Sequence, residues 1–149
     1  MENKNRHKIV SAVFLVLLRE ENTKKQVLLQ LRQNTGYMDG RWDLGASGHV
    51  EENELIEDAL VRETKEEIGI IIDKKDIKFV HFRHWNEENY FNFFFACDKY
   101  EGVPKIMETE KCAELKWFDL DNLPNNLTEH NKLALESIKK GDYYEITTG

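Results

Sequence analysis

Three glutamates near the end of one predicted helix are the residues of this chain best suited to chemistry. Residues 54–68 contain no Pro or Gly and are rich in helix formers, which predicts a helix with Asn53 as its N-cap that ends at Gly69. At about 100° of rotation per residue, the glutamates continue a face that is apolar over the two preceding turns. The apolar positions are Leu55, Ile56, Ala59 and Leu60, and the acidic ones are Glu63, Glu66 and Glu67. The pattern predicts carboxylates that face inward.

An inward-facing acidic cluster needs a compensating charge. Like charges three and four residues apart repel each other. The C-terminal end of a helix is also the negative end of its dipole, which disfavours carboxylates there. A solvated acidic face is the ordinary interpretation of such a cluster, but it does not explain a stripe that continues the apolar face. Mg²⁺ or Mn²⁺ would remove these penalties, because hard cations prefer oxygen ligands and Mg²⁺ commonly binds carboxylates together with substrate phosphates. The cluster therefore predicts a metal-dependent enzyme that acts on a phosphorylated substrate.

The segment around this helix carries a recognisable signature. Residues 48–70 read GHVEENELIEDALVRETKEEIGI. This segment resembles the Nudix box, G-x5-E-x7-R-E-U-x-E-E-x-G-U, in which U is a bulky aliphatic residue. Thr64, at the first aliphatic position, is the one departure and keeps a branched methyl group. The matching positions are Gly48, Glu54, Arg62, Glu63, Glu66, Glu67, Gly69 and Ile70.

The resemblance implies a fold, a reaction and roles for several residues. The Nudix fold is an α/β/α sandwich with a mixed β-sheet between helices, and the family hydrolyses a nucleoside diphosphate linked to another group. By position, Glu66 and Glu67 match metal ligands, and Glu63 matches either a metal ligand or the general base. Arg62 matches the arginine that orients these glutamates through charge-assisted hydrogen bonds. Gly48 matches a glycine whose carbonyl oxygen can bind the metal.

The substrate is narrowed only to nucleotides. Residues 34–40 with Trp42 resemble a segment of MutT-like members, which favours a nucleoside triphosphate, ordinary or oxidised, as substrate and nucleoside monophosphate and pyrophosphate as products. ADP-ribose, nucleotide sugars, dinucleoside polyphosphates and capped RNA ends are alternatives. A Nudix-fold binding module without catalysis is the non-hydrolase alternative, but such modules usually lose glutamates that are kept here. Isopentenyl-diphosphate isomerase shares a segment like residues 47–51, yet its catalytic cysteine precedes the box, whereas Cys97 and Cys112 follow it.

Residues outside the box supply further candidates. The family often places an additional glutamate after the box, which makes Glu108 and Glu110, in a predicted loop over residues 100–111, candidates for a further metal ligand or base. Two aromatic residues could stack on a nucleobase and two arginines could contact phosphate. These candidates are Tyr37, Trp42, Arg32 and Arg41. We interpret His81 and His84 as structural histidines, with substrate contact as the alternative.

The elements that must position these residues follow the order strands, helix, strands, helix. This order predicts an α/β domain whose mixed sheet is covered by helices. Two hairpins are expected, the first between residues 9–18 and 26–31 and the second between 77–86 and 89–98. A second helix, with Thr128 as its N-cap, is expected to precede Gly141. The remaining expected elements are a loop over 33–41, short strands within 42–50 and a strand over 113–118.

Composition limits the other classes of function. A length of 149 residues predicts one domain over residues 1–149, with a loose terminus over 1–8. The net charge of −7 argues against nucleic acid as the main partner. The longest apolar stretch, residues 9–18, is too short to span a membrane. Two cysteines without zinc-site spacing predict reduced thiols and a cytoplasmic protein. Many proteins that the box resembles are dimers, so a homodimer is compatible with this sequence.

Overall fold

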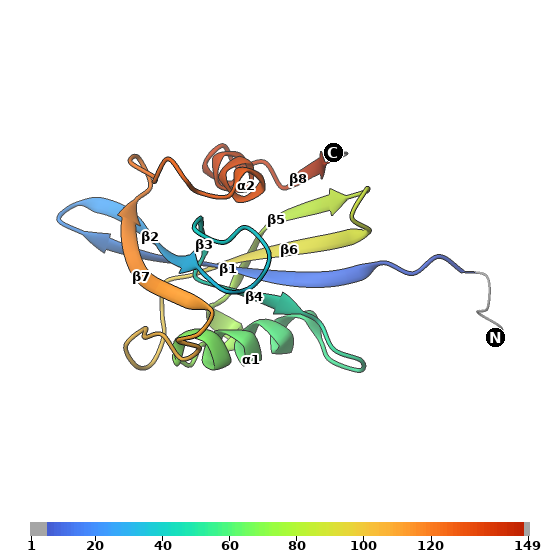
Figure 1. Ribbon diagram of the computed structural model, residues 1–149, viewed down its shortest axis with the longest axis horizontal. Helices are drawn as coiled ribbons and strands as arrows, with labels where there is room; N and C mark the ends of the chain where they lie inside the picture. Colours follow the sequence, from blue (N-terminus) through green and yellow to red (C-terminus); the bar gives the residue numbers. More distant parts are fainter. Residues whose placement is uncertain (1–5, 148–149) are drawn as a thin grey trace.

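A mixed β-sheet lies between two helices in this protein. The computed structural model describes residues 6–147, so most of the expected loose terminus over 1–8 lies outside the described residues. Figure 1 shows helix α2 on one side of the sheet and helix α1 on the other. The predicted sandwich of a mixed sheet between helices is confirmed. The strands are β1 (Val10–Glu21), β2 (Lys24–Arg32), β3 (Trp42–Leu44), β4 (Ala46–His49), β5 (Lys78–Trp85), β6 (Tyr90–Cys97), β7 (Cys112–Asp119) and β8 (Tyr144–Thr147). The helices are α1 (Ile56–Ile68), the 3₁₀ turn η1 (Lys74–Asp76) and α2 (Glu129–Lys139).

Strand β1 organises the sheet. The hydrogen-bonded order is β3-β2-β1-β6-β5-β8, with β4 added on β1 and β7 added on β2. Antiparallel pairing of β1 with β2 and of β5 with β6 confirms both predicted hairpins. The pairing of β1 with β6 is parallel, which the hydrophobic pattern did not predict, because such a pattern indicates burial but not the partner strand.

The two faces of β1 contribute to separate cores, as its continuous apolar run predicts. Val13 and Leu15 pack on the α1 side together with Leu60. Val16 packs on the α2 side together with Leu135. Both helices are thus held by apolar burial, which gives the carboxylates of α1 a rigid support.

Helix α1 differs from the prediction at its beginning. Its N-cap is Leu55 and not Asn53, which has a left-handed backbone with φ of 63°. The backbone N–H of Glu51 donates to Glu54 Oε1 over 3.0 Å, so residues 51–54 form a turn before the helix. At the other end Gly69 adopts φ of 70° and closes the helix, as predicted.

The buried face of α1 also differs from the prediction. Leu55 is 62% exposed, whereas Thr64 and Ile68 are buried and extend the apolar stripe to the end of the helix. The acidic residues therefore lie beside the apolar stripe and do not replace it. The burial of Thr64 agrees with an apolar role for its methyl group, because its hydroxyl has no hydrogen-bond partner among residues 6–147.

Two features near the C-terminus complete the fold. Thr128 is the N-cap of α2, as predicted, although its side chain makes no capping hydrogen bond. Strand β8, which was not predicted, pairs in parallel with β5 at the edge of the sheet. Within residues 6–147, no helix is long and apolar enough to cross a bilayer.

Candidate functional site

The backbone of β4 and one face of α1 meet at the centre of the site. A side chain at Gly48 would overlap the Glu63 carboxylate, so this position of the carboxylate against β4 requires a glycine. One residue earlier, the backbone N–H of Ser47 donates to Glu67 Oε2 over 2.9 Å. Two of the box glutamates therefore lie directly against β4, the strand in which the box begins.

Arg62 holds several acidic side chains in place. Its Nε and Nη2 donate to the two oxygens of Glu54 over 2.8 and 3.0 Å. Its Nη1 donates to Glu63 over 2.8 Å and to Glu66 over 3.3 Å, and its Nη2 also donates to the His49 carbonyl over 3.0 Å. The hydrogen bonds from Arg62 hold the pKa of Glu54 down at about 2, and the same contacts raise the pKa of Arg62. This geometry suits the orienting role that the Nudix box implies for the arginine.

Four carboxylates line one cavity of about 600 Å³. Three come from α1, namely Glu63, Glu66 and Glu67, and the fourth, Glu108, comes from the loop before β7. Burial raises the pKa of Glu67 to about 8, and the negative charges of Glu63 and Glu108 contribute to this increase. Burial also raises the pKa of Glu63. We call this cavity the acidic cleft.

The acidic cleft fits a divalent cation by its donor chemistry. Within the described residues 6–147, no three His, Cys, Asp or Glu side chains are grouped closely enough to hold an ion without movement. The raised pKa of Glu67 nevertheless identifies a buried carboxylate whose negative charge is poorly compensated, since it accepts from a backbone amide and not from a cationic side chain. Hard oxygen donors around one cavity are what Mg²⁺ and Mn²⁺ require.

The two candidate glutamates after the box differ in position. Glu108 lines the acidic cleft, and Lys111 lies 3.9 Å from its carboxylate. Glu110 is exposed and is not among the described residues that line the cleft. Its backbone carbonyl accepts from Asn34 over 3.2 Å. Of the two, only Glu108 is positioned to act with the glutamates of the box.

A second cavity, of about 350 Å³, adjoins the acidic cleft. The two share Arg32, Ser47 and His49 in their walls. We call the second cavity the aromatic cavity, because its walls include several aromatic side chains. The aromatic side chains are Phe14, Tyr37, Trp85, Tyr90 and the imidazoles of His49 and His130.

Only some of the residues predicted to contact the substrate line one of the two cavities. Arg32 lines both cavities and is held by Asp43 at 3.3 Å and by the Tyr37 carbonyl at 2.9 Å. Tyr37 lines the aromatic cavity, as a stacking residue must. Trp42, which we expected to contact the substrate, lies elsewhere: it is 8% exposed and packs edge-on against Phe118 in the α2-side core. Arg41, which we also expected to contact the substrate, is exposed but is not among the described residues that line either cavity.

Several cavity residues were missed from the sequence. Trp85 and His130 come from β5 and α2. Asn92 is a buried polar residue within a run of phenylalanines, a signal that could have indicated a functional position. Asp43 directly follows Trp42 in the sequence. Asp43 lines the aromatic cavity, whereas Trp42 is not among its described lining residues.

The two histidines of β5 have structural surroundings. His81 is fully buried, its Nδ1 lies 2.8 Å from the Asp142 carbonyl and its Nε2 lies 3.1 Å from Glu145. His84 packs edge-on against Phe91. Neither is among the described residues that line the acidic cleft or the aromatic cavity, which agrees with a structural role.

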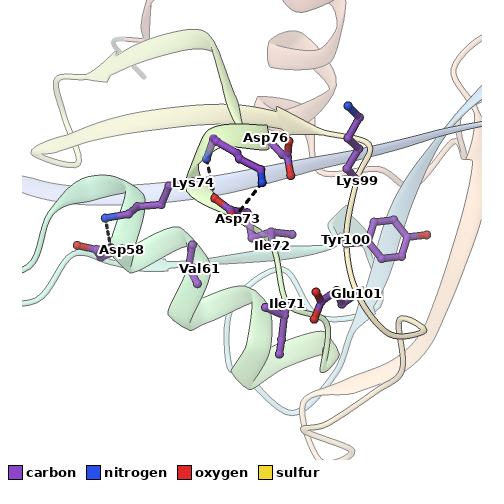
Figure 2. Close-up of a pocket in the computed structure, with 11 residues that line it drawn as sticks. Asp58, Val61, Ile71, Ile72, Asp73, Lys74, Asp76, Lys99, Tyr100 and Glu101 are labelled. Atoms are coloured by element: carbon purple, nitrogen blue, oxygen red, sulfur yellow. Dashed lines mark hydrogen bonds and ion pairs between the residues drawn. The ribbon is translucent and has the colours of Figure 1, made fainter.

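A third hollow, of about 530 Å³, lies on the side of α1 opposite Glu63. Figure 2 shows Lys74 beside Asp58, which it contacts at 2.9 Å. Lys75 contacts Asp73 at 3.8 Å. Because two ion pairs already match four of its charges, this hollow has less to offer a charged ligand than the acidic cleft.

Comparisons with known proteins identify the family. The chain is 34% identical over 101 residues to the oxidized purine nucleoside triphosphate hydrolase of Danio rerio, a match covering 66% of this chain and 62% of that protein. It is 35% identical over 94 residues to the ADP-ribose pyrophosphatase of Methanocaldococcus jannaschii, covering 62% of this chain and 54% of that protein. The chain thus spans less than two thirds of the length of these relatives.

Comparison of structures gives the same family. The crystal structure of the MutT NUDIX hydrolase from Burkholderia pseudomallei superposes with a TM-score of 0.75 and 26% identity, covering 87% of this chain and 98% of that one. The family model of the NUDIX domain matches residues 8–139, which include the whole box and the acidic cleft. This chain belongs to the Nudix family.

Proposed function

We propose that this protein is a divalent-metal-dependent pyrophosphohydrolase that cleaves a nucleoside triphosphate to a nucleoside monophosphate and pyrophosphate. The observation that carries the proposal is the shared wall between the acidic cleft and the aromatic cavity, formed by Arg32, Ser47 and His49. A ligand that occupies both cavities needs a flat apolar part and an anionic part that binds metal, and a nucleotide has both.

The carboxylates supply the metal-binding half of the site. Glu63, Glu66 and Glu67, with the Gly48 carbonyl, are the groups that would hold Mg²⁺ or Mn²⁺. Such an ion, when bound, neutralises phosphate charge and lowers the pKa of a bound water molecule. Arg62 keeps the glutamates in position through the hydrogen bonds described above.

Hydrolysis also needs an acceptor for a proton. A water oxygen bonds to phosphorus as the bridging P–O bond breaks, pyrophosphate departs with the electrons of that bond, and the proton of the water passes to a carboxylate. Glu63 and Glu108 are the candidates for this base, because both line the cleft from different elements. Arg32 lies at the junction of the two cavities, where its guanidinium can contact a phosphate oxygen.

The choice of a triphosphate rests on size and on similarity. A cavity of about 350 Å³ is at the small end of the usual range for ligand sites, which suits one nucleoside and not two. The similarity to an oxidized purine nucleoside triphosphate hydrolase supports the same choice. ADP-ribose is the second candidate substrate, favoured by the similarity to an ADP-ribose pyrophosphatase.

A substrate panel tests the proposal. Nucleoside triphosphates, ordinary and oxidised, would be compared with ADP-ribose, nucleotide sugars and dinucleoside polyphosphates, with and without Mg²⁺, by measuring released phosphate groups. We expect Mg²⁺-dependent release of pyrophosphate from triphosphates, loss of turnover in Glu67→Gln, and retention in Glu57→Gln, which changes an exposed acid of the same helix. Turnover of ADP-ribose alone would replace the proposed substrate, and turnover that persists in Glu67→Gln would refute the site.

A further inference from the structure

The guanidinium of Arg32 lies in the wall of both cavities. Four carboxylates line the acidic cleft beside it. Within residues 6–147, however, the one carboxylate that lies within 4.0 Å of the guanidinium is that of Asp43. Asp43 lines the aromatic cavity and is not among the described residues that line the cleft. Arg32 is therefore paired with a single acid, although four others surround the adjoining cleft.

Three contacts hold the Arg32 guanidinium in this position. Its Nη1 donates to Asp43 Oδ2 over 3.3 Å, its Nε to the Tyr37 carbonyl over 2.9 Å and its Nη2 to Thr35 Oγ1 over 3.2 Å. Thr35 and Tyr37 belong to the loop between β2 and β3, whereas Asp43 lies on β3 within the sheet. Of the three acceptors, only the carboxylate adds the attraction of a full charge. Asp43 is thus the main electrostatic partner of Arg32.

Asp43 is itself fixed by donors inside the protein. It is 4% exposed, and its Oδ1 accepts from the Leu44 N–H over 2.8 Å and from Asn131 Nδ2 on α2. Because each of these neighbours donates, the contacts are best satisfied by a carboxylate and not by a protonated acid. Burial raises the pKa of Asp43, while its hydrogen bonds and the charge of Arg32 act in the opposite direction. Arg32 is therefore the counter-ion of a buried negative charge.

The amide of Asn131 is held in turn by a buried arginine. Arg83 on β5 is fully buried, and a guanidinium offers only hydrogen-bond donors. Its Nη2 donates to Asn131 Oδ1 over 3.3 Å, which leaves Nδ2 of that amide toward Asp43. Its Nη1 donates to Glu145 on β8 over 3.3 Å. A continuous series of contacts thus runs from the edge of the sheet to Asp43 and keeps its carboxylate in one position.

Without this partner, the Arg32 guanidinium would be attracted to the acidic cleft. Arg32 already lines the cleft together with Glu67, whose buried carboxylate accepts from the Ser47 N–H and has no cationic partner among the described residues. An arginine binds a carboxylate through two parallel hydrogen bonds, so that both carboxylate oxygens are occupied. Carboxylate oxygens are also the donors that a divalent cation requires. An intramolecular ion pair in the cleft would therefore compete with the cation.

From these contacts we infer that Asp43 is a positioning residue, which holds the Arg32 guanidinium at the junction of the two cavities and so keeps it from competing with a divalent cation in the acidic cleft. Asp43 acts through Arg32 and does not itself bind the cation. Arg32 then stays available for a phosphate oxygen. This inference rests on the proposed function for the ligand of the cleft.

Binding of Mn²⁺ in the absence of nucleotide measures the competition. Free Mn²⁺ would be followed by electron paramagnetic resonance in titrations of wild type, Asp43→Asn, Arg32→Gln and the double variant. Asp43→Asn keeps the size of the side chain and removes its charge. We expect it to weaken Mn²⁺ binding by about tenfold, as results if the released guanidinium occupies the cleft about nine tenths of the time. Arg32→Gln should bind Mn²⁺ at least as tightly as wild type, because it removes the competing charge, and the double variant should match Arg32→Gln.

A purely structural role of Asp43 predicts a different result. Asp43→Asn would then weaken Mn²⁺ binding equally with and without Arg32, or not at all, and either result in folded protein would overturn the inference. Asp98→Asn, which removes an exposed negative charge, is the matched control and should bind Mn²⁺ like wild type. Asp43→Ser keeps an oxygen for the Leu44 N–H but lacks the charge, so it replaces Asp43→Asn, with the same expectations, if that variant does not fold.

The Mn²⁺ titration and the substrate panel separate this inference from the proposed function. The expected pattern of Mn²⁺ binding in a protein that hydrolyses no triphosphate would leave the role of Asp43 intact and refute the proposed function. Hydrolysis of triphosphates with Mn²⁺ binding that does not depend on Asp43 would do the reverse. Absence of Mn²⁺ binding by wild type at millimolar concentration would overturn the inference, whatever the panel shows.

Discussion

Glu67→Gln should make the metal-free protein more stable near neutral pH, although we expect the same change to remove activity. The folded protein buries this carboxylate, and its pKa is raised from 4.5 to about 8. On unfolding the side chain returns to its ordinary pKa, so near pH 7 the folded wild type must either bind a proton or bury a charge. Glutamine avoids both, and its amide oxygen can still accept the Ser47 N–H that now donates to Glu67 over 2.9 Å.

The size of the effect follows from the shift in pKa. Each pKa unit corresponds to about 1.4 kcal/mol, and the interval from the ordinary pKa to pH 7 spans about 2.5 units, which sets an upper limit of about 3.5 kcal/mol. Because the folded pKa of this acid is raised, metal-free stability is greatest below about pH 4.5 and falls as pH rises toward 8. With relaxation of the site we expect about 1–2 kcal/mol near neutral pH, or about 2–8 °C in Tm for a domain of this size.

Thermal unfolding in EDTA measures this prediction. Wild type, Glu67→Gln and the exposed control Glu57→Gln would be compared near pH 5 and near pH 8. The difference between wild type and Glu67→Gln should grow with pH, whereas Glu57→Gln should follow wild type closely. Mg²⁺ should then stabilise wild type more than Glu67→Gln, since binding to the folded state raises stability. A Glu67→Gln protein that is less stable than wild type near pH 8 without metal would refute the reasoning.

Substitutions at Gly48 and Glu108 examine the same site, with Glu110→Gln as the control for the second. Gly48→Ala should lower kcat by about tenfold or more with little change in Tm, because the new Cβ displaces the flexible end of Glu63 and not the backbone. A large loss of Tm with normal kcat in the folded fraction would contradict this prediction. Glu108→Gln should lower kcat, whereas Glu110→Gln should not, because of these two only Glu108 lines the acidic cleft. Equal kcat values for the two variants would refute the assignment of Glu108 to the site.

The spacing of the box determined much of the acidic cleft from the sequence alone. Arg62, Glu63, Glu66 and Glu67 lie within two turns of one helix, so their mutual placement follows from the helical repeat. The end of that helix at Gly69 is equally local, because a left-handed residue there needs no distant partner. The relative positions of residues within one helix can therefore be predicted from their spacing in the sequence, without knowledge of the fold.

Errors arose where local patterns compete with tertiary contacts. Asn53 has the residue type of an N-cap, but the bond between the Glu51 amide and Glu54 draws residues 51–54 into a turn, and the helix begins later. Leu55 fits the apolar stripe by angle, yet no core lies opposite it, and the buried stripe continues instead through Thr64 and Ile68.

The aromatic cavity was decided by the tertiary structure. Trp42 and Trp85 are equivalent by residue type, but sheet order puts Trp42 in the core and Trp85 in the wall of the aromatic cavity. Glu108 and Glu110 are two residues apart, yet only the path of the loop across α1 brings Glu108 into the acidic cleft. Arg83 and Asn92 lie opposite each other only because β5 pairs with β6 in this register. The helical repeat could place the glutamates, whereas contacts between residues distant in sequence depend on strand pairing, which residue type and spacing do not encode.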